Sequence, residues 1–440
     1  MLVEHPCNKN WLRSGACGPI LSGPQAPNTG GSMLGRLTIN TSHACNLDCS
    51  YCYAEGGNYG GKSLLMDEYE VLTRLMKVVQ KHDAIALVQF IGGEPLLNLP
   101  AIRTVCETVN NLVATNALKK QPRFAVVTNL TVLTEEHLEA FKEFEITVTV
   151  SIDGPDYIHD KQRPKKNALT GTHAIILENL ARLEIADIPY AFEATYTRLH
   201  LQNNVTFVDL LEYFSKWKPY RIDITPVSVP GKSELGFCTE DEQGLVVKYQ
   251  LDALNYVLDH LSKGHVVPYG YLREVIGLLK SEGSDHFCPA GESNLAIASD
   301  GEVYGCHMFT NKKQYRVGEF TNSHGFPKAR DTRSSLGSKL EATPIVVENP
   351  TVIPFPTKSM IPGCNQCWAR RWCRACLGNM EIRSPGKPVP FNLHCELTKR
   401  SLELVLQRLS VVIGDFCKIV DAERKPGMLG KSEAVPALNA

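Results

Sequence analysis

The sequence lacks any long hydrophobic run, and no stretch approaches the roughly 18 uninterrupted apolar residues that a transmembrane helix requires. Its first residues, MLVEHPCNKN, also lack the basic segment and apolar core of a secretion signal. Together these two absences predict a cytoplasmic protein without a membrane partner.

An excess of charge of one sign is missing as well. The formal net charge is -1, with 21% charged and 43% hydrophobic residues, which is typical of a soluble globular protein. This balance gives no indication of nucleic acid as a partner. The single basic run, KQRPKK at 161–166, is short and interrupted by Pro164, so we expect an ordinary solvated loop there.

Cysteine, by contrast, is abundant, with 15 residues in the chain. Reducing cytosol disfavours disulfides, so a chain without a secretion signal is expected to use its cysteines in another way. Metal ligation is the leading explanation, and the cysteines are therefore the first candidates for a functional site.

Short segments rich in β-branched and aromatic residues recur from Arg36 onward and predict six strands. They are 36–41, 86–91, 124–128, 146–152, 189–196 and 220–225. Between them, apolar residues at three- and four-residue spacing predict helices. These cover 66–82, 101–118, 134–144, 172–183 and 205–217. Strands that alternate with helices are typical of parallel βαβ units, so we predict an α/β fold.

Six such units can form an open sheet or a partial (β/α)6 TIM barrel, and in both the loops after the strands build the site. The segments that follow the first four strands are SHACNLDCSYC, GGEP, NLTV and DGP. They contain cysteine, glycine or polar residues, as the rim of a site requires. We therefore predict the functional residues at the C-terminal edge of the sheet.

The chain is long enough for one large domain and one smaller domain. Residues 1–35, rich in Gly, Pro, Ser and Asn, are expected to form a loosely ordered arm. Residues 36–280 are predicted to form the barrel and a helical stretch from about 241 to 280. Cysteines return after Ser281, so 281–423 are predicted to form a second, cysteine-rich domain, and 424–440 a disordered tail.

Cys45, Cys49 and Cys52 have the spacing CxxxCxxC within the loop predicted after the first strand. Three thiolates on a four-iron cluster leave one iron without a cysteine, and an open coordination position is what a catalytic metal site needs. A structural zinc site with His43 as the fourth ligand is the alternative, although such sites typically use paired CxxC motifs.

The loop after the second predicted strand contains Gly92, Gly93 and Glu94, followed by Pro95. The glycines expose backbone polar groups and the glutamate supplies a carboxylate, so this loop can receive an amino group. Placed one βα unit after a CxxxCxxC loop, it resembles the loop of the radical S-adenosylmethionine (SAM) enzymes. The resemblance covers most of 36–230 and continues through VTN (127–129), SIDGP (151–155), HD (159–160) with Arg163, GT (171–172) and EATYT (193–197).

The resemblance implies that SAM chelates the open iron through its amine and carboxylate. The reduced cluster then cleaves SAM to a 5′-deoxyadenosyl radical, which abstracts a hydrogen atom from the substrate. The resemblance also implies contacts of the Gly92–Glu94 backbone with the amine, of Ser151 with the ribose and of Arg163 with the carboxylate. Glu193 and Thr195 lie two residues apart on a predicted strand, so both can face the site, with packing as the alternative.

A second cysteine array occupies the last third of the chain, with the dense centre CxxCx5CxxC. Two zinc ribbons are one explanation, since CxxC pairs are typical of zinc sites. The order and spacing, however, resemble the SPASM extension of radical SAM enzymes, which carries two auxiliary four-iron clusters. One departure is that two residues separate the last pair, where three are usual. The array consists of Cys288, Cys306, Cys364, Cys367, Cys373, Cys376 and Cys395.

The SPASM resemblance implies how these cysteines are shared. The outer auxiliary cluster would be held by Cys364, Cys367, Cys373 and Cys395, and the inner one by Cys288, Cys306 and Cys376. The inner cluster then lacks a ligand, because the position where some family members have a fourth cysteine is Asn294. An open iron there can bind a substrate thiolate, since soft ligands suit iron–sulfur centres. The alternative is that Cys238, Cys7 or Cys17 completes the cluster.

SPASM enzymes mostly modify peptides or proteins. The resemblance therefore implies a ribosomally made peptide as substrate, with a cysteine, and an external electron donor of the ferredoxin or flavodoxin type. We expect a thioether bond, because the segment GCHMF…YRVGEF resembles that of thioether- or crosslink-forming maturases. Anaerobic sulfatase maturases are a second candidate, but they are expected to have Asp where this chain has His307. A carbon–carbon crosslinking or epimerising maturase is a third, and it would need no open auxiliary iron.

Outside the enzymes, a zinc-stabilised binding module without radical activity is the alternative. Only 44 residues precede Cys45, which is too few for a complete winged-helix module for peptide recognition. Leader-peptide recognition is therefore expected from a separate partner protein or from the short arm.

Overall fold

The computed structural model describes residues 33–167, 170–230, 233–318, 355–386 and 390–408. The predicted tail at 424–440 and nearly all of the predicted arm at 1–35 lie outside these residues. Three residues of the arm are described, and two of them, Met33–Leu34, form the short strand β1, which pairs with β3 (Ala84–Ile85).

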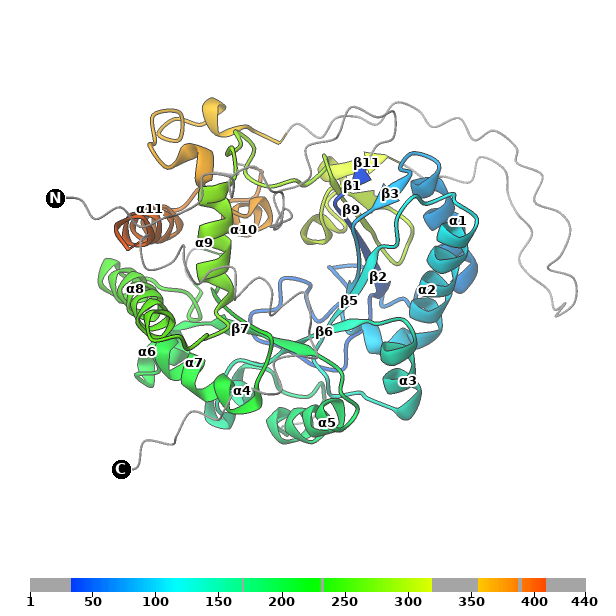
Figure 1. Cartoon of the computed structure of the whole chain (residues 1–440), viewed down its shortest axis with the longest axis horizontal. Coiled ribbons are helices and arrows are strands. Elements are labelled where there is room, and N and C mark those ends of the chain that lie inside the picture. Colours follow the sequence, from blue (N-terminus) through cyan, green and yellow to red (C-terminus); the bar gives the residue numbers. More distant parts are fainter. Residues whose placement is uncertain (1–32, 168–169, 231–232, 319–354, 387–389, 409–440) are drawn as a thin grey trace, which may run out of the picture.

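A curved nine-stranded sheet forms the centre of the molecule (Figure 1). All six predicted strands are confirmed, and they form consecutive parallel pairs. The predicted α/β fold with a partial barrel is therefore confirmed as well. The six strands are β2 (Arg36–Ser42), β4 (Leu87–Gly92), β5 (Arg123–Thr128), β6 (Thr147–Ser151), β7 (Tyr190–Tyr196) and β8 (Arg221–Pro226).

The helices that connect these strands lie on the outer side of the curved sheet (Figure 1). Five of them match the predicted helices, and the short helices α4 and α6 were not expected. They are α1 (Glu68–Val79), α2 (Leu99–Ala114), α3 (Glu135–Glu143), α4 (Asp156–Gln162), α5 (His173–Ile185), α6 (Arg198–Gln202) and α7 (Phe207–Phe214).

The helical stretch predicted from 241 to 280 consists of two helices, α8 (Glu240–Ser262) and α9 (Gly270–Lys280). Gly264 ends the first helix with a φ of +81°, a left-handed conformation that glycine adopts without strain. Pro268 follows, and its ring cannot continue a helix. The two later helices are α10 (Leu377–Arg383) and α11 (Asn392–Gln407).

The sheet continues beyond the boundary proposed near residue 281. Strand β9 (Asn294–Ile297) pairs in parallel with β2, with Leu295 opposite Leu37. Strands β10 (Val303–Tyr304) and β11 (Arg316–Gly318) follow in antiparallel order. The cysteine-rich part is thus anchored directly on the first barrel strand, and its separation as a domain at 281 stays a proposal.

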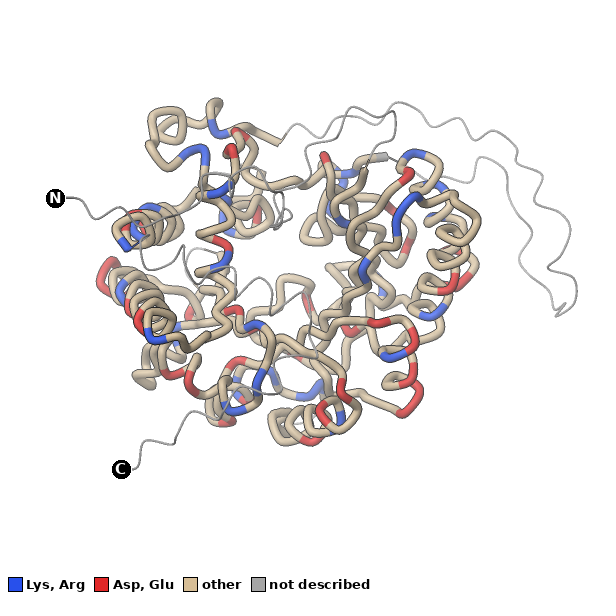
Figure 2. The backbone as a smooth tube through the Cα atoms, viewed as in Figure 1, with Lys and Arg blue, Asp and Glu red and all other residues tan. Residues whose placement is uncertain are grey.

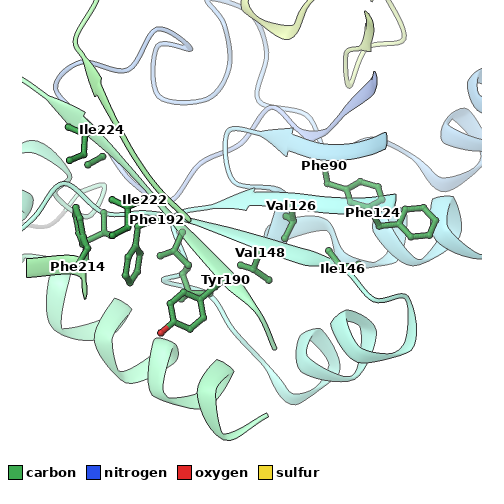
Figure 3. Close-up of a cluster of buried hydrophobic side chains, with 14 of the residues drawn as sticks. Phe90, Phe124, Val126, Ile146, Val148, Tyr190, Phe192, Phe214, Ile222 and Ile224 are labelled. Atoms are coloured by element: carbon green, nitrogen blue, oxygen red, sulfur yellow. The ribbon is translucent and has the colours of Figure 1, made fainter. Parts of the chain in front are cut away.

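Alternating side chains of the barrel strands pack between the sheet and the outer helices (Figure 3). Val126, Val148, Phe192 and Ile222 are completely buried there, together with Phe214 of α7. Because side chains alternate along a strand, the intervening positions face the interior of the barrel. Ser151 is opposite Glu193, which is opposite Asp223 in the next pair of strands. The interior of the barrel is therefore polar.

The cysteine-rich part has its own smaller core, which includes Phe287, Tyr304, Phe309 and Met380. Acidic and basic residues are intermixed along the outer helices (Figure 2). Among the described residues, no helix is both long and apolar enough to cross a membrane.

Candidate functional site

The loop after β2 brings three thiols together. The pKa of Cys45 is raised to about 11, chiefly by burial, and the Cys52 thiol adds to the effect. Burial also raises the pKa of Cys49 to about 12, against the lowering effect of Arg163, while Cys52 and Cys45 raise it further. Buried thiols of this kind lose their protons only when a cation compensates the charge, as metal ligands do.

The basic run at 161–166 holds this loop in place. The N–H groups of Asp48 and Ser50 donate to the carbonyls of Pro164 (3.0 Å) and Gln162 (2.9 Å). The N–H of Lys166 donates in return to the carbonyl of Asn46 at 2.9 Å. Gln162 is also buried. The prediction of an ordinary solvated loop is therefore wrong, because the backbone of this run pairs with the cysteine loop and only its lysines face solvent.

Two glycines allow the backbone to approach the cysteine loop. A Cβ at Gly93 would lie 2.3 Å from the carbonyl oxygen of Ala44. A Cβ at Gly57, where φ is +99°, would lie 2.7 Å from the Cα of Gly93 and 2.8 Å from the Cβ of Cys45. Neither distance is compatible with a side chain, so the packing around Cys45 requires both glycines.

Replacing Gly93 with alanine should therefore displace the cysteine loop and lower the iron content of the anaerobically prepared protein. Iron and labile sulfide per chain measure this effect. Gly244→Ala is the matched control, since a Cβ there meets nothing within 4 Å and alanine favours a helix. Equal iron content in both variants would show that the close contact is not required.

Glu94 ties the glycine loop to the end of β5. Its carboxylate accepts hydrogen bonds from the N–H of Leu96 (3.0 Å), the hydroxyl of Thr128 (2.6 Å) and the N–H of Asn129 (2.8 Å). Burial raises the pKa of Glu94 to about 7, against the lowering effect of these three donors. Because its oxygens are already used, the backbone carbonyls of the loop are the groups that can meet an amine.

A buried ion pair lies under the cysteine loop. The carboxylate of Asp153 accepts from the Nε of Arg163 at 3.1 Å and from the hydroxyl of Tyr51 at 2.6 Å. It also accepts from the side-chain amide of Gln162 at 2.9 Å and from the backbone N–H of Thr195 at 3.0 Å. Although burial opposes it, Asp153 raises the pKa of Arg163 well above its ordinary value. Arg163 is thus fixed in the site and is not a solvated surface residue.

The terminal nitrogens of Arg163 make no hydrogen bond within the described residues, and its guanidinium lies 5.3 Å from the ring centroid of Tyr51. Ser151 and Thr195, at the ends of β6 and β7, lie on the interior side of neighbouring strands. Glu193 precedes Thr195 by one pleat and faces the same way. Ser151, Glu193 and Thr195, three of the predicted SAM-contact residues, therefore share the interior side of the sheet.

Four cysteines of the second array form an outer group. Cys395 interacts with the thiols of Cys373, Cys364 and Cys367, and burial raises its pKa to about 11. The buried Lys358 lies beside this group, with its Nζ donating to the carbonyls of Ser284 (2.7 Å) and Arg370 (2.8 Å). Cys373 also raises the pKa of this lysine, although burial lowers it more, to about 8. A fixed cation therefore accompanies four thiols.

Cys288, Cys306 and Cys376 form a separate inner group. Burial raises the pKa of Cys376 to about 12, and the thiols of Cys306 and Cys288 add to the effect. The sulfur of Met308, which sequence reasoning missed, lies 3.7 Å from Cys376 Sγ. A cavity of about 270 Å³ adjoins Cys376 between the barrel and the C-terminal helices. Its walls include Thr225 of β8, Glu274 of α9 and His394 of α11.

The residues considered as alternative ligands lie elsewhere or have other partners. The Nε2 of His43 accepts from the N–H of Ser299 at 3.2 Å, so this nitrogen is not free for zinc. Asn294 lies in β9, opposite Arg36. Cys238 is exposed and its thiol contacts the carbonyl of Gly236 at 3.4 Å. Cys7 and Cys17 lie outside the described residues.

Within the described residues, no three Cys, His, Asp or Glu side chains are placed to hold a single metal ion. A four-iron cluster makes a different demand, since each thiolate binds a different iron atom. The loop has three neighbouring, half-buried thiols and a backbone lined by glycines. Beside it lies an arginine whose terminal nitrogens make no hydrogen bond within the described residues. This arrangement fits a four-iron cluster and a bound carboxylate. The fold and this loop together define the class: a partial-barrel iron–sulfur protein.

Comparison with known proteins identifies the domain that carries the cysteine loop. The model of the radical SAM superfamily matches residues 39–215. A cysteine-type anaerobic sulfatase-maturating enzyme of Clostridium novyi is 26% identical over 397 residues, which cover 86% of this chain and 97% of the relative. A probable GTP 3′,8-cyclase of Saccharolobus solfataricus is 24% identical over 286 residues, covering 63% and 83%. The chain thus contains a radical SAM domain, which indicates an enzyme of radical chemistry, and its C-terminal part is rich in cysteine.

Solved structures support the same fold. The tagged protein described as anSMEcpe with bound AdoMet has a TM-score of 0.67 and 18% sequence identity, covering 89% of this chain and 98% of that chain. The same protein has been solved with AdoMet and a peptide called Kp18Cys, with a TM-score of 0.64 and 18% identity. At this identity the likeness concerns the fold.

Sequence reasoning missed the residues that position the site. The sequence predicts no role for Tyr51 or Asp153, although they lie within the motifs SHACNLDCSYC and SIDGP. It predicts no role for Gln162 or Gly57 either. A carboxylate at a strand end ten residues before an arginine carries no signal of pairing by itself. The contact depends on helix α4, which turns the chain back toward the cysteine loop.

Proposed function

We propose that this enzyme modifies a ribosomally made peptide and joins the sulfur of a peptide cysteine to a carbon atom as a thioether. One observation carries this proposal: the inner group contains three thiols, and one of them, Cys376, borders a cavity. Among the described residues, no fourth cysteine interacts with this group. A cluster held there would have room for a thiolate from a substrate.

In this proposal, Cys45, Cys49 and Cys52 hold the cluster that binds SAM. When bound, a reduced four-iron cluster with SAM supplies a 5′-deoxyadenosyl radical. The chain's own residues bind and orient: the terminal nitrogens of Arg163 receive the carboxylate of SAM and the backbone of Gly92–Glu94 receives its amine. Ser151 and Thr195 line the same side of the sheet for the ribose.

The outer and inner cysteine groups are proposed to hold two auxiliary four-iron clusters. Cys364, Cys367, Cys373 and Cys395 supply a complete ligand set for the outer one. Lys358 balances part of its negative charge, since a buried cation stabilises neighbouring thiolates. Cys288, Cys306 and Cys376 hold the inner one.

The reaction removes two hydrogens from the peptide. A carbon atom loses one hydrogen atom to the SAM-derived radical, which becomes 5′-deoxyadenosine. As the carbon–sulfur bond forms, the thiol loses one proton to solvent and one electron, which an auxiliary cluster held by the inner group would accept. An external donor of the ferredoxin or flavodoxin type supplies the electron that starts the cycle. Leader recognition is assigned to a separate protein or to the N-terminal arm, and we expect the enzyme to work in the cytoplasm.

The test incubates reduced, cluster-loaded enzyme with candidate cysteine-containing peptides. The product should be lighter by two hydrogens, and its cysteine should resist alkylation. Cys376→Ala should still cleave SAM to 5′-deoxyadenosine but form no thioether, whereas Cys238→Ala, at an exposed position, should form it normally. A product whose cysteine is freely alkylated would contradict the thioether.

A modification like that of the anaerobic sulfatase maturases is the second candidate. The relative from Clostridium novyi supports it, because its alignment with this chain covers 97% of the relative's length. The residue after Cys306 argues against it, since this chain has His307 where such enzymes are expected to have Asp. A sulfatase-derived peptide that is modified at its cysteine without a new sulfur–carbon bond would favour this candidate.

A further inference from the structure

Two buried histidines hold the backbone at the end of strand β6. The N–H of Asp153 donates to Nδ1 of His159 at 3.2 Å. The carbonyl oxygen of Asp153 lies 2.8 Å from Nε2 of His200. Both rings are completely buried, and they come from α4 and α6, the two short helices that the sequence did not predict. Each ring therefore contacts the backbone of the residue whose carboxylate pairs with Arg163.

The partners of each ring determine which nitrogen carries the hydrogen. A backbone N–H can only donate, so Nδ1 of His159 is unprotonated and its Nε2 carries the hydrogen. Burial lowers the pKa of His159 to about 4, which keeps the ring neutral at neutral pH. In His200, Nδ1 accepts from the N–H of Thr197 at 3.0 Å, so Nε2 donates to the carbonyl of Asp153.

The two rings differ in what their other nitrogen contacts. Nε2 of His159 donates to the hydroxyl of Thr172 at 3.0 Å, and this hydroxyl donates to the carbonyl of Arg163 at 2.7 Å. The N–H of Arg163 donates in turn to the carbonyl of His159 at 2.8 Å. Thr172 is completely buried, and its hydroxyl does not cap helix α5. His159 is thus linked to Arg163 on both sides of that residue's backbone, whereas His200 is linked to Thr197.

These hydrogen bonds and the ion pair hold Arg163 at both ends. Its backbone is held by His159 and Thr172, and its Nε donates to the carboxylate of Asp153 at 3.1 Å. Only the terminal nitrogens make no hydrogen bond within the described residues. Apolar groups of the same shape would stabilise a core about as well as a buried polar chain, so the chain indicates a role in orientation.

We propose that His159 and Thr172 are positioning residues, which orient the terminal nitrogens of Arg163 toward the carboxylate of SAM. A guanidinium held in one geometry binds a carboxylate without losing further conformational freedom. This inference rests on the proposed function, which assigns the carboxylate of SAM to Arg163.

Thr172→Val tests the link with a small change in shape, because valine lacks the hydroxyl that joins His159 to Arg163. His159→Leu is the second variant, and Thr172→Ser keeps the hydroxyl. Affinities are measured by equilibrium dialysis on anaerobic, cluster-loaded and unreduced enzyme. The ligands are SAM and decarboxylated SAM, which keeps the sulfonium and the amine but has no carboxylate.

Arg163→Met should weaken the binding of SAM about 10- to 100-fold, as expected for the loss of hydrogen bonds to a charged group. Thr172→Val and His159→Leu should each weaken it about 10-fold, because a displaced guanidinium keeps only part of these bonds. Thr172→Ser should bind SAM as the unchanged enzyme does. All variants should bind decarboxylated SAM equally, which also shows that they are folded.

Combination with Arg163→Met separates positioning from a purely structural role. In that background, neither Thr172→Val nor His159→Leu should weaken SAM binding further, because both act through the arginine. Additive losses would overturn the proposal. Thr108→Val is the matched control, since it removes a hydroxyl that donates to the carbonyl of Thr104 on α2 at 2.7 Å. It should bind both ligands as the unchanged enzyme does.

The outcomes distinguish this inference from the proposed function. Unchanged SAM affinity in Arg163→Met would refute the carboxylate contact assigned to Arg163, and the inference with it. Weaker SAM binding in Arg163→Met, with unchanged binding in Thr172→Val and His159→Leu, would refute the inference alone.

Discussion

Cys49→Ala should abolish the cleavage of SAM to 5′-deoxyadenosine by the reduced protein. The variant removes one of three thiols that the loop holds together, and a cluster with two remaining ligands is not retained in catalytic form. Iron content should fall by about four atoms per chain, the size of one cluster. Product analysis by chromatography and iron determination on the same sample measure both effects.

Cys238→Ala is the control for this prediction. Its thiol is exposed and contacts only neighbouring carbonyls, at 3.6 Å (Ser233) and 3.4 Å (Gly236). This variant should keep its iron and its activity. Cleavage of SAM by Cys49→Ala at the unchanged rate would place the radical-generating cluster elsewhere in the chain.

Asp153→Asn should lower the free energy of unfolding by about 3–5 kcal/mol, the range found when one partner of a buried ion pair is removed. Asp153 is completely buried, and its loss leaves the charge of Arg163 without compensation. The same substitution weakens the hydrogen bond from Tyr51, which lies within the cysteine loop. Denaturant unfolding of the anaerobic protein measures the change.

The control is Asp259→Asn, which breaks an exposed pair with Arg408 and should cost no more than about 1 kcal/mol. The ionised form of Asp153 is favoured by Arg163 despite burial, so its pKa lies below the ordinary 3.8. Its stabilising effect is therefore complete above this value and is lost as the pH falls through the lower pKa of the folded state. An equal loss of unfolding free energy in Asp153→Asn and Asp259→Asn would mean that the buried ion pair stabilises the protein no more than the exposed one.

The strands could be predicted because their pattern is local. Segments such as 146–152 are rich in β-branched residues, and β6 spans Thr147–Ser151 accordingly. Strand β9 escaped prediction, because NLAI is short and its pairing with β2 joins residues more than 250 positions apart. The break between α8 and α9 depends on a single glycine and a proline, which outweigh the apolar periodicity around them.

The candidate site likewise combines local features, which could be predicted, with contacts between distant segments, which could not. Cys45, Cys49 and Cys52 lie within eight residues, so their spacing alone indicates a shared centre. The partners of Asp153, by contrast, come from the cysteine loop, from α4 and from β7, and nothing local in the sequence marks them as one group. The role of the 161–166 run was misjudged for the same reason, since a charged composition does not reveal which backbone groups pair with another loop.

The most direct test of the central claim is a single measurement on the unchanged protein, prepared without oxygen. After reduction and addition of SAM, the protein should form 5′-deoxyadenosine, and the same preparation should contain iron and labile sulfide. A colourless protein that contains zinc, has no labile sulfide and leaves SAM intact would contradict the account.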